Sequence, residues 1–247
     1  MRVLITGVGD AFSRVHYGSS AVVESGRAYV AIDCPDPYHR VLHEACGASG
    51  WRITADAIDD YIITHLHADH CHGLETVGLS QWVARMKGSR QAAPRLHTSA
   101  AAAGKLWEML EPGMGTLIGT GRPMTIEDYF DVRILTPGET AKVGPLAVRA
   151  RVTTHHVPTL GLLLSDGART LGWSSDTRYE QAHIDWLAEA DVIVHETSPL
   201  PAHCPVEHLN EQAAAVRAKM RLVHAPDGFD AMRTDIPLLR EGDVLEV

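Results

Sequence analysis

The segment 63–73 reads ITHLHADHCHG and holds four histidines and one aspartate within eight positions. Imidazole nitrogens and carboxylate oxygens are donor atoms that divalent metal ions bind in proteins. His65 and His67 are two positions apart, and in extended backbone this spacing directs both side chains to the same side. Asp69 and His70 follow past the expected bend, where they can face a second ion. The segment therefore predicts a site for two metal ions; a histidine-rich surface loop is the alternative.

The elements of the fold must position these candidate ligands close together. Residues 62–64 are the end of an apolar strand, and the chain as a whole alternates short β-rich runs with helical patterns. We expect one domain over residues 1–247, with two sheets packed face to face and helices outside. Strands are expected at 3–5, 21–23, 29–32, 132–135, 146–148, 160–164, 192–194 and 222–223. Helices are expected at 37–46, 74–86, 98–110, 180–189 and 207–220.

Composition narrows the classes of function. The formal net charge of −9 argues against a duplex-binding surface, which needs clustered Lys and Arg, but leaves a small anionic substrate open. The four cysteines form no CxxC pair, so we expect free thiols. The start lacks a basic and apolar leader, and no apolar run approaches the roughly 18 residues of a membrane span. These features favour a cytoplasmic protein without a membrane partner.

A second short segment, GVGDAFS at residues 7–13, contains two glycines in a GxG pattern. A dinucleotide-binding loop would need a third glycine where a helix opens, and none is present there. We therefore interpret the segment as a glycine turn, with a dinucleotide site as the weaker alternative.

The HxHxDH pattern at the end of an apolar strand is also the signature of the metallo-β-lactamase superfamily. The sequence resembles this superfamily along nearly its whole length, in the phosphodiesterase-like branch of ribonuclease Z and cyclic phosphodiesterases. The resemblance implies an α/β fold, the αββα four-layer sandwich of two mixed sheets with helices outside.

The resemblance also implies the remaining metal ligands. Residues 153–161, TTHHVPTLG, resemble the family's third-histidine segment; the spacing of six to Gly161 favours His155, with His156 left open. The segment SSDT resembles the family's SGDT, which makes Asp176 the bridging aspartate, with helix capping as the alternative. The strand end MRLVH supplies the last histidine. The implied ligands are His65, His67 and His155 for one ion, Asp69, His70 and His224 for the other, and Asp176 between them.

This donor set predicts a hydrolase. It contains nitrogen and oxygen but no thiolate, which suits two zinc ions, although manganese or iron fits the same donors. Two cations held about 3.5–4 Å apart can share a water, lower its pKa towards neutrality and provide a bridging hydroxide as the nucleophile. Because Asp69 belongs to this water-activating site, it is counted among the expected catalytic residues.

The later part of the chain indicates which bond is cut. VIVHETS resembles the HEAT segment of ribonuclease Z, and HLNEQAA resembles the later histidine of that branch. The resemblance implies that Glu196 and His208 form a hydrogen-bonded pair in which His208 protonates the departing alkoxide. An ordinary buried ion pair for Glu196 and a helix-start position for His208 are the alternatives. Asp33 resembles the family's early aspartate, which orients a ligand imidazole, or is a turn residue.

The expected substrate is a small anionic diester, cyclic or nucleotide-like. Ribonuclease Z carries a long basic arm between its third histidine and bridging aspartate, whereas a short hairpin joins these positions here, so we expect no tRNA-binding arm. A carboxylic ester, thioester or lactone hydrolase is the alternative. A diiron oxidoreductase or metal-binding protein ranks lower, because the redox relatives carry HxExD where this chain has His67. The resemblance further suggests a homodimer, and the segment 104–124 is expected to be a lid, a dimer contact or a surface connection.

Overall fold

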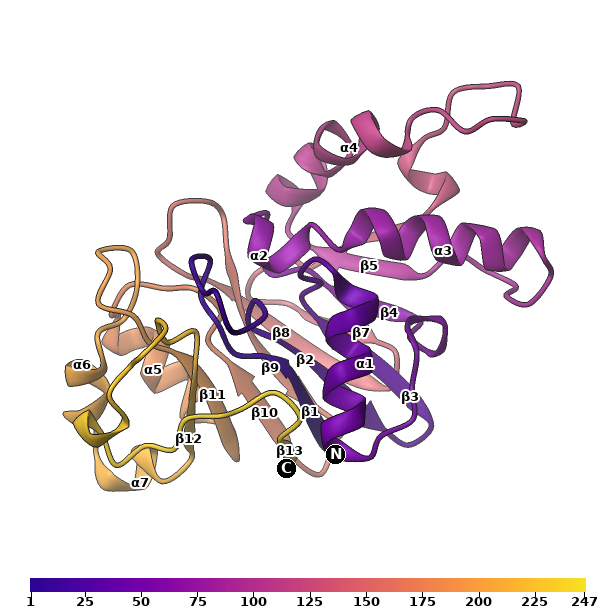
Figure 1. Ribbon diagram of the computed structural model, residues 1–247. Helices are drawn as coiled ribbons and strands as arrows, with labels where there is room; N and C mark the ends of the chain where they lie inside the picture. Colours follow the sequence, from indigo (N-terminus) through magenta and orange to yellow (C-terminus); the bar gives the residue numbers. More distant parts are fainter.

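Several strands of this protein, such as β1, are apolar on both faces. The computed structural model describes residues 1–247. In β1 (Arg2–Gly7), Val3 and Ile5 belong to one buried cluster and Leu4 belongs to another. Successive side chains of a strand point to opposite faces, so a strand of this kind must be covered on both sides. This requirement gives the layered fold of Figure 1, in which two stacked sheets lie between two groups of helices.

The first sheet has seven strands in the order β13-β1-β2-β3-β4-β5-β6. The sheet is mixed, because β13, β1, β2 and β3 pair antiparallel, whereas β3 to β6 pair parallel. Its strands are β1, β2 (Ser20–Ser25), β3 (Ala28–Ile32), β4 (Asp60–Ile62), β5 (Arg95–Thr98), β6 (Asp131–Ile134) and β13 (Val244–Glu246).

The second sheet has six strands in the order β12-β11-β10-β9-β8-β7. It is also mixed: β7 to β10 pair antiparallel, and β10 to β12 pair parallel. Its strands are β7 (Thr140–Val143), β8 (Leu146–Val152), β9 (Leu160–Ser165), β10 (Thr170–Trp173), β11 (Val192–Glu196) and β12 (Met220–Val223). The hairpin of β9 and β10 is the short connection expected between His155 and Asp176.

Helices cover the two outer faces. They are α1 (Tyr38–Ser49), α2 (Ala68–Cys71), α3 (Leu74–Met86), α4 (Ala100–Met114), α5 (Gln181–Leu187), α6 (Val206–Asn210) and α7 (Ala214–Arg217). Side chains of α1, α3 and α4 join one buried cluster with the first sheet, and side chains of α5 and α6 join another with the second sheet. A third cluster fills the space between the sheets. The expected αββα sandwich of two mixed sheets is confirmed.

The strand expected at 132–135 overlaps β6, the edge strand of the first sheet, beside β5. One predicted helix is wrong. The helix expected over 207–220 is broken into α6 and α7. Arg217 donates hydrogen bonds to the backbone oxygens of Gln212 at 2.6 Å and Asn210 at 3.4 Å. These local bonds satisfy backbone oxygens at the break between α6 and α7, where the continuous helix pattern of the sequence is interrupted.

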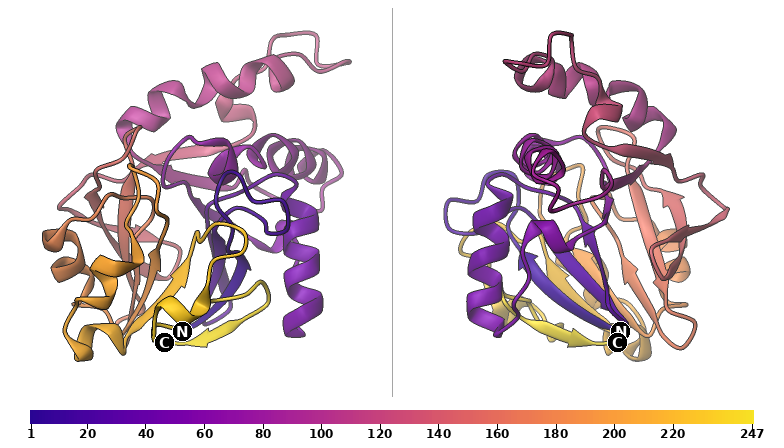
Figure 2. Two further views of the ribbon diagram at one scale, coloured as in Figure 1. Left: turned by 60° about the vertical axis from the view of Figure 1, so that its left-hand side comes forward. Right: turned by 90° about the vertical axis from the view of Figure 1, so that its right-hand side faces the viewer.

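The chain ends lie side by side, at the end of the sheets away from the loops that follow β3, β4 and β12 (Figure 2). Residues 104–114 of the segment 104–124 continue α4, and residues 115–124 form the loop that projects beside α4 in Figure 1. None of the helices combines the length and apolarity that crossing a membrane requires.

Candidate metal centre

The predicted ligands come from loops that leave the strands at one end of the sandwich. His65 and its neighbours follow β4, His155 follows β8, and Asp176 follows β10. His224 directly follows β12. Irregular backbone beyond strand ends allows side chains from both sheets to converge. Seven side chains from four segments of the sequence thus meet at this end of the sandwich.

The backbone is strained where three strands enter this site. Asp33, Ser175 and His224 are the non-glycine residues with left-handed backbone, with φ angles of 61°, 55° and 60°. Such residues cost free energy and persist where the surrounding structure holds them, often at functional sites. All three are buried and follow β3, β10 and β12 closely. The strained backbone therefore lowers the free energy of unfolding at this end of the sheets.

The first ligand group consists of His65, His67, His155 and Asp176, whose donor atoms lie within 4.8 Å of one another. Nδ1 of His67 is 3.1 Å from Nε2 of His65 and 3.1 Å from Nε2 of His155. Three nitrogens bound tetrahedrally to zinc at 2.0–2.1 Å would be about 3.3 Å apart. The distances between these nitrogens therefore agree with three ligands of one zinc ion.

The tautomers of these rings support the same conclusion. The hydroxyl of Thr64 donates to Asp33 at 2.8 Å, so it accepts from Nδ1 of His65 at 3.0 Å. Nδ1 of His155 donates to the backbone oxygen of Ala202 at 3.1 Å. In both rings the proton is on Nδ1, which leaves Nε2 as a lone pair directed at the other ligands. Both lone pairs face Nδ1 of His67, which can carry at most one proton, so a bound cation would satisfy them better than hydrogen bonds.

The second group consists of Asp69, His70 and His224. Oδ2 of Asp69 lies 3.2 Å from Nε2 of His70 and 3.6 Å from Nε2 of His224. These three atoms are buried and have no hydrogen-bond partner. Buried polar atoms are rarely left without a partner, so the group fits a bound ion. Asp33 orients the ring of His70, because its carboxylate accepts from Nδ1 at 2.8 Å, as the resemblance implied.

Asp176 lies between the two groups. Its Oδ2 is 3.5 Å from Nε2 of His155 and 3.4 Å from Nε2 of His224. Its Oδ1 is 3.4 Å from Nε2 of His70. One carboxylate therefore faces ligands of both groups, which is the geometry expected of a bridging aspartate.

Charge divides the two groups. Burial lowers the pKa of His65 well below its usual value and that of His155 to about 4, so both rings are neutral. Burial also disfavours the charged form of His224, but the Asp176 carboxylate outweighs it and raises the pKa of His224 to about 9. The pKa of His70 is raised well above its usual value by Asp176, against the effect of burial. The second group thus attracts positive charge.

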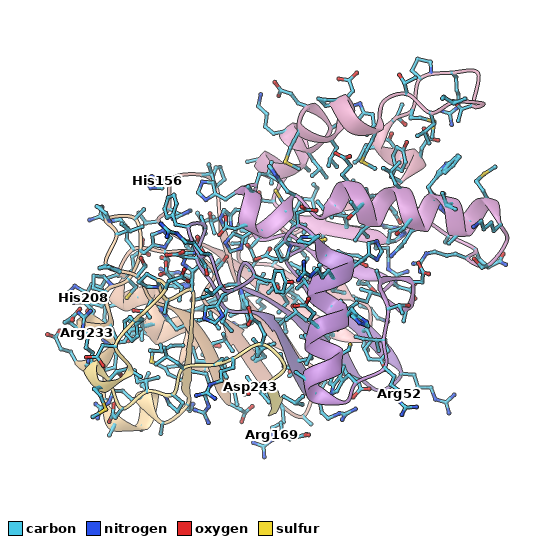
Figure 3. All side chains as sticks on the ribbon, viewed as in Figure 1. Arg52, His156, Arg169, His208, Arg233 and Asp243 are labelled. Atoms are coloured by element: carbon cyan, nitrogen blue, oxygen red, sulfur yellow. The ribbon has the colours of Figure 1, made fainter.

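Of the two adjacent histidines, His155 lies in the ligand cluster. His156 is exposed and projects at the outer edge of the molecule (Figure 3). Its ring centroid is 6.3 Å from that of His67, and its nitrogens are in neither ligand group. The geometry therefore favours His155 as the third histidine.

The expected hydrogen bond between Glu196 and His208 is not formed. Oε1 of Glu196 is 2.9 Å from Nδ1 of His203 and accepts from the backbone N–H of Thr177 at 2.7 Å. His208 lies on α6 at the outer face (Figure 3), where its ring stacks on Tyr179 at 4.1 Å between centroids. The helix-start alternative for His208 agrees with this position, and His203 is the partner that sequence reasoning missed.

His203 also lines the cavity above the ligand groups. This cavity has a volume of about 510 Å³, and the ring of His203 stacks on that of His224 at 4.9 Å between centroids. Asp10 and Phe12, from the segment interpreted as a glycine turn, line the same cavity and were also missed. Asp10 and Phe12 follow β1 closely, and strand ends often carry functional residues. His203 lies seven residues after the end of β11, where the sequence gives no such signal.

Comparison with known proteins identifies the family. The family model of the anti-Pycsar protein Apyc1 matches residues 1–240. The chain is 32% identical to the anti-Pycsar protein Apyc1 of Bacillus phage 010DV004, over 97% of this chain and 95% of the relative. It is 28% identical to Apyc1 of Paenibacillus xerothermodurans, over 93% and 90%.

Among solved structures, the metallo-β-lactamase fold protein YhfI of Bacillus subtilis superposes with a TM-score of 0.80 at 17% identity. The match covers 99% of this chain and 98% of YhfI. The fold is therefore that of the metallo-β-lactamases, as the HxHxDH pattern predicted. By the extent of the family match, the chain belongs to the anti-Pycsar Apyc1 family.

Proposed function

We propose that this metal-dependent hydrolase opens the cyclic phosphodiester of a small nucleotide at a centre of two divalent cations. The observation that carries the proposal is the pair of ligand groups that share Asp176 at the cavity described above. His65, His67 and His155 would hold one ion, and Asp69, His70 and His224 the other. When bound, the two ions supply an activated water and stabilise negative charge on phosphate oxygens.

The donor set supports zinc, with manganese and iron as the ions that metal analysis must separate from it. All seven ligands are imidazoles or carboxylates, which bind each of these metals. The four cysteines are buried, and none is in a ligand group. The absence of thiolate therefore leaves the choice of metal to availability and geometry.

The cavity supports a mononucleotide-sized substrate. Its volume of about 510 Å³ lies within the roughly 300–1,000 Å³ typical of small-molecule sites. The net charge of −9 disfavours a polyanion such as tRNA, whereas a single phosphodiester would be neutralised by the ions themselves. These features favour a small cyclic diester over RNA.

The pair of Glu196 and His203 would handle the proton that the leaving oxygen needs. Burial, and then the neighbouring Asp176, raise the pKa of Glu196 well above its usual value, while burial lowers that of His203. Nδ1 of His203 faces Glu196, so Nε2 is the nitrogen available to the cavity. With its raised pKa, Glu196 can carry a proton and donate it to Nδ1 of His203, which places the ring's own proton on Nε2. As the bond between phosphorus and the ribose oxygen breaks, Nε2 of His203 would donate its proton to the departing alkoxide while Nδ1 takes the proton of Glu196.

The test compares leaving groups. In the metal-loaded protein, His203→Gln should lower kcat on a 3',5'-cyclic nucleotide by about 10²–10⁴-fold, because the alkoxide needs a proton. On bis(p-nitrophenyl) phosphate the loss should be much smaller, because nitrophenolate leaves without one. His208→Gln is the matched control and should leave both rates largely unchanged. A large loss in His208→Gln would restore the assignment made from the sequence.

The same preparation tests the reaction class. His67→Ala should abolish turnover and lower the metal content. Turnover of a homoserine lactone or a thioester, with none of either phosphodiester, would replace the phosphodiesterase proposal with the carboxylic ester, thioester or lactone alternative. The expected homodimer remains a prediction that light scattering can check.

A further inference from the structure

The loop between β1 and β2 forms one wall of the cavity and carries an exposed aromatic side chain. Asp10, Ala11 and Phe12 line the cavity beside the ligand Asp69. Phe12 is 76% exposed, a high value for a phenylalanine. An exposed large apolar side chain at the mouth of a cavity often marks a binding surface. The loop is also the segment GVGDAFS, to which the proposed chemistry gives no role.

Hydrogen bonds hold this loop in one conformation. Asp227 accepts from the hydroxyl of Ser13 at 2.5 Å and from the backbone N–H of Arg14 at 2.8 Å. Glu241 accepts from the backbone N–H of Tyr17 at 2.8 Å. The backbone N–H of Phe12 donates to Asp10 at 2.9 Å. A fastened backbone presents the ring without a large entropy cost on binding.

The base of the loop is packed directly on the metal-ligand segment. A Cβ added to Gly18 would lie 2.0 Å from the backbone oxygen of Asp69, a contact that no side chain can make. Only glycine permits this approach. The base of the loop that carries Phe12 is therefore held against the segment of the centre that would bind the phosphate.

We propose that Phe12 is the platform on which the base of the cyclic nucleotide stacks. This proposal rests on the proposed function. No lysine or arginine lines the cavity, and Phe12 and Leu200 are among its apolar lining residues. A planar heterocycle fits such apolar contacts, because stacking on an aromatic ring is favourable for every base.

The experiment compares a cyclic nucleotide with a ribose 3',5'-cyclic phosphate that carries a methoxy group in place of the base. Phe12→Ala should raise KM for 3',5'-cyclic AMP about tenfold and leave kcat unchanged. The loss of one base–aromatic stack is expected to weaken binding about 5- to 150-fold. KM for the base-free compound should not change. Phe12→Tyr should restore the wild-type KM. Val15→Ala, in the same loop and 70% exposed, is the matched control.

Each outcome decides between explanations. An equal rise in KM for both compounds would show that Phe12 shapes the cavity rather than contacting the base, and would overturn the proposal. A fall in kcat without a change in KM, or a matching effect of Val15→Ala, would overturn it as well. If the wild-type protein hydrolyses the cyclic nucleotide and Phe12→Ala does so with the same KM, the proposed function stands and the stacking proposal fails. If the wild type hydrolyses neither compound, both fail.

Discussion

Replacement of Asp33 by asparagine tests whether the second ion depends on an oriented histidine. Asp33 accepts three hydrogen bonds, from the backbone N–H and the hydroxyl of Thr64 and from Nδ1 of His70, each at 2.8 Å. An asparagine has one acceptor oxygen, and its NH2 group would face at least one of these donors in either orientation. Nδ1 of His70 would then be free to give up its proton, and Nε2 would lose its fixed lone pair.

The expected loss follows from this geometry. Removal of a partner that orients a ligand histidine typically weakens metal binding by about 10–100-fold, or about 1.4–2.7 kcal/mol. The second group should bind the weaker ion at neutral pH, because its histidines must release protons first. Calorimetric titration of the metal-free protein with zinc should therefore show that Asp33→Asn raises the Kd of the weaker ion about 10- to 100-fold. Asp36→Asn, an exposed position three residues later, is the control.

An unchanged Kd for both ions in Asp33→Asn would refute the reasoning, since it would mean that His70 does not bind a metal through Nε2 or needs no support from Asp33. An equal loss in Asp36→Asn would assign the effect to charge alone. A drop in kcat at full metal occupancy would also count against it, because the predicted effect acts through metal affinity.

Three further predictions concern the charge, the packing and the core. Zinc binding should release protons from His70 and His224, because the pKa of each is raised in the folded protein. The proton on His224 stabilises the metal-free fold fully below about pH 6.5, and this stabilisation is lost as the pH rises through about 9. The apparent affinity for zinc should therefore rise up to about pH 9, and calorimetric heats measured in buffers of different ionisation enthalpy would show the proton release. Gly18→Ala should displace the backbone of Asp69, reduce the metal content and lower the free energy of unfolding by about 1–3 kcal/mol in urea titrations. Leu162→Ala, buried between the sheets, should lower that free energy by about 2–5 kcal/mol without loss of metal from the folded protein.

The parts of the fold that were predicted correctly rest on local patterns. The helix expected at 74–86 matches α3, and the strand expected at 160–164 lies within β9. Periodicity within one element is sufficient to predict such segments. The position of β6 and the return of β13 to the first sheet depend on pairing between strands far apart in sequence. No local pattern encodes that pairing, so these features could not be read from the residues.

The candidate site divides in the same way. His65 and His67 were placed by their spacing at a strand end, and the structure brings their nitrogens within 3.1 Å of each other. Asp176 and His224 were found by family resemblance, because nothing in their own spacing relates them to residue 65. The structure supplies the physical reason: β10 and β12 are parallel neighbours of β11, so all three strands end at the same edge.

The partner of Glu196 was predicted neither by local residue spacing nor by family resemblance, because its position depends on a loop. After β11 the chain turns back, since the backbone N–H of Ser198 donates to the oxygen of Cys204 at 3.2 Å and that of His203 donates to the oxygen of Leu200 at 3.0 Å. This closed turn brings His203 beside Glu196, seven positions earlier in the sequence. A histidine at the start of a helix seemed the better partner by resemblance, but α6 directs its chain away over the outer face of the sheet. Because the turn is closed by backbone bonds, the residue type at 203 can change without moving the loop, and His203→Gln therefore isolates the chemistry of the ring from the fold.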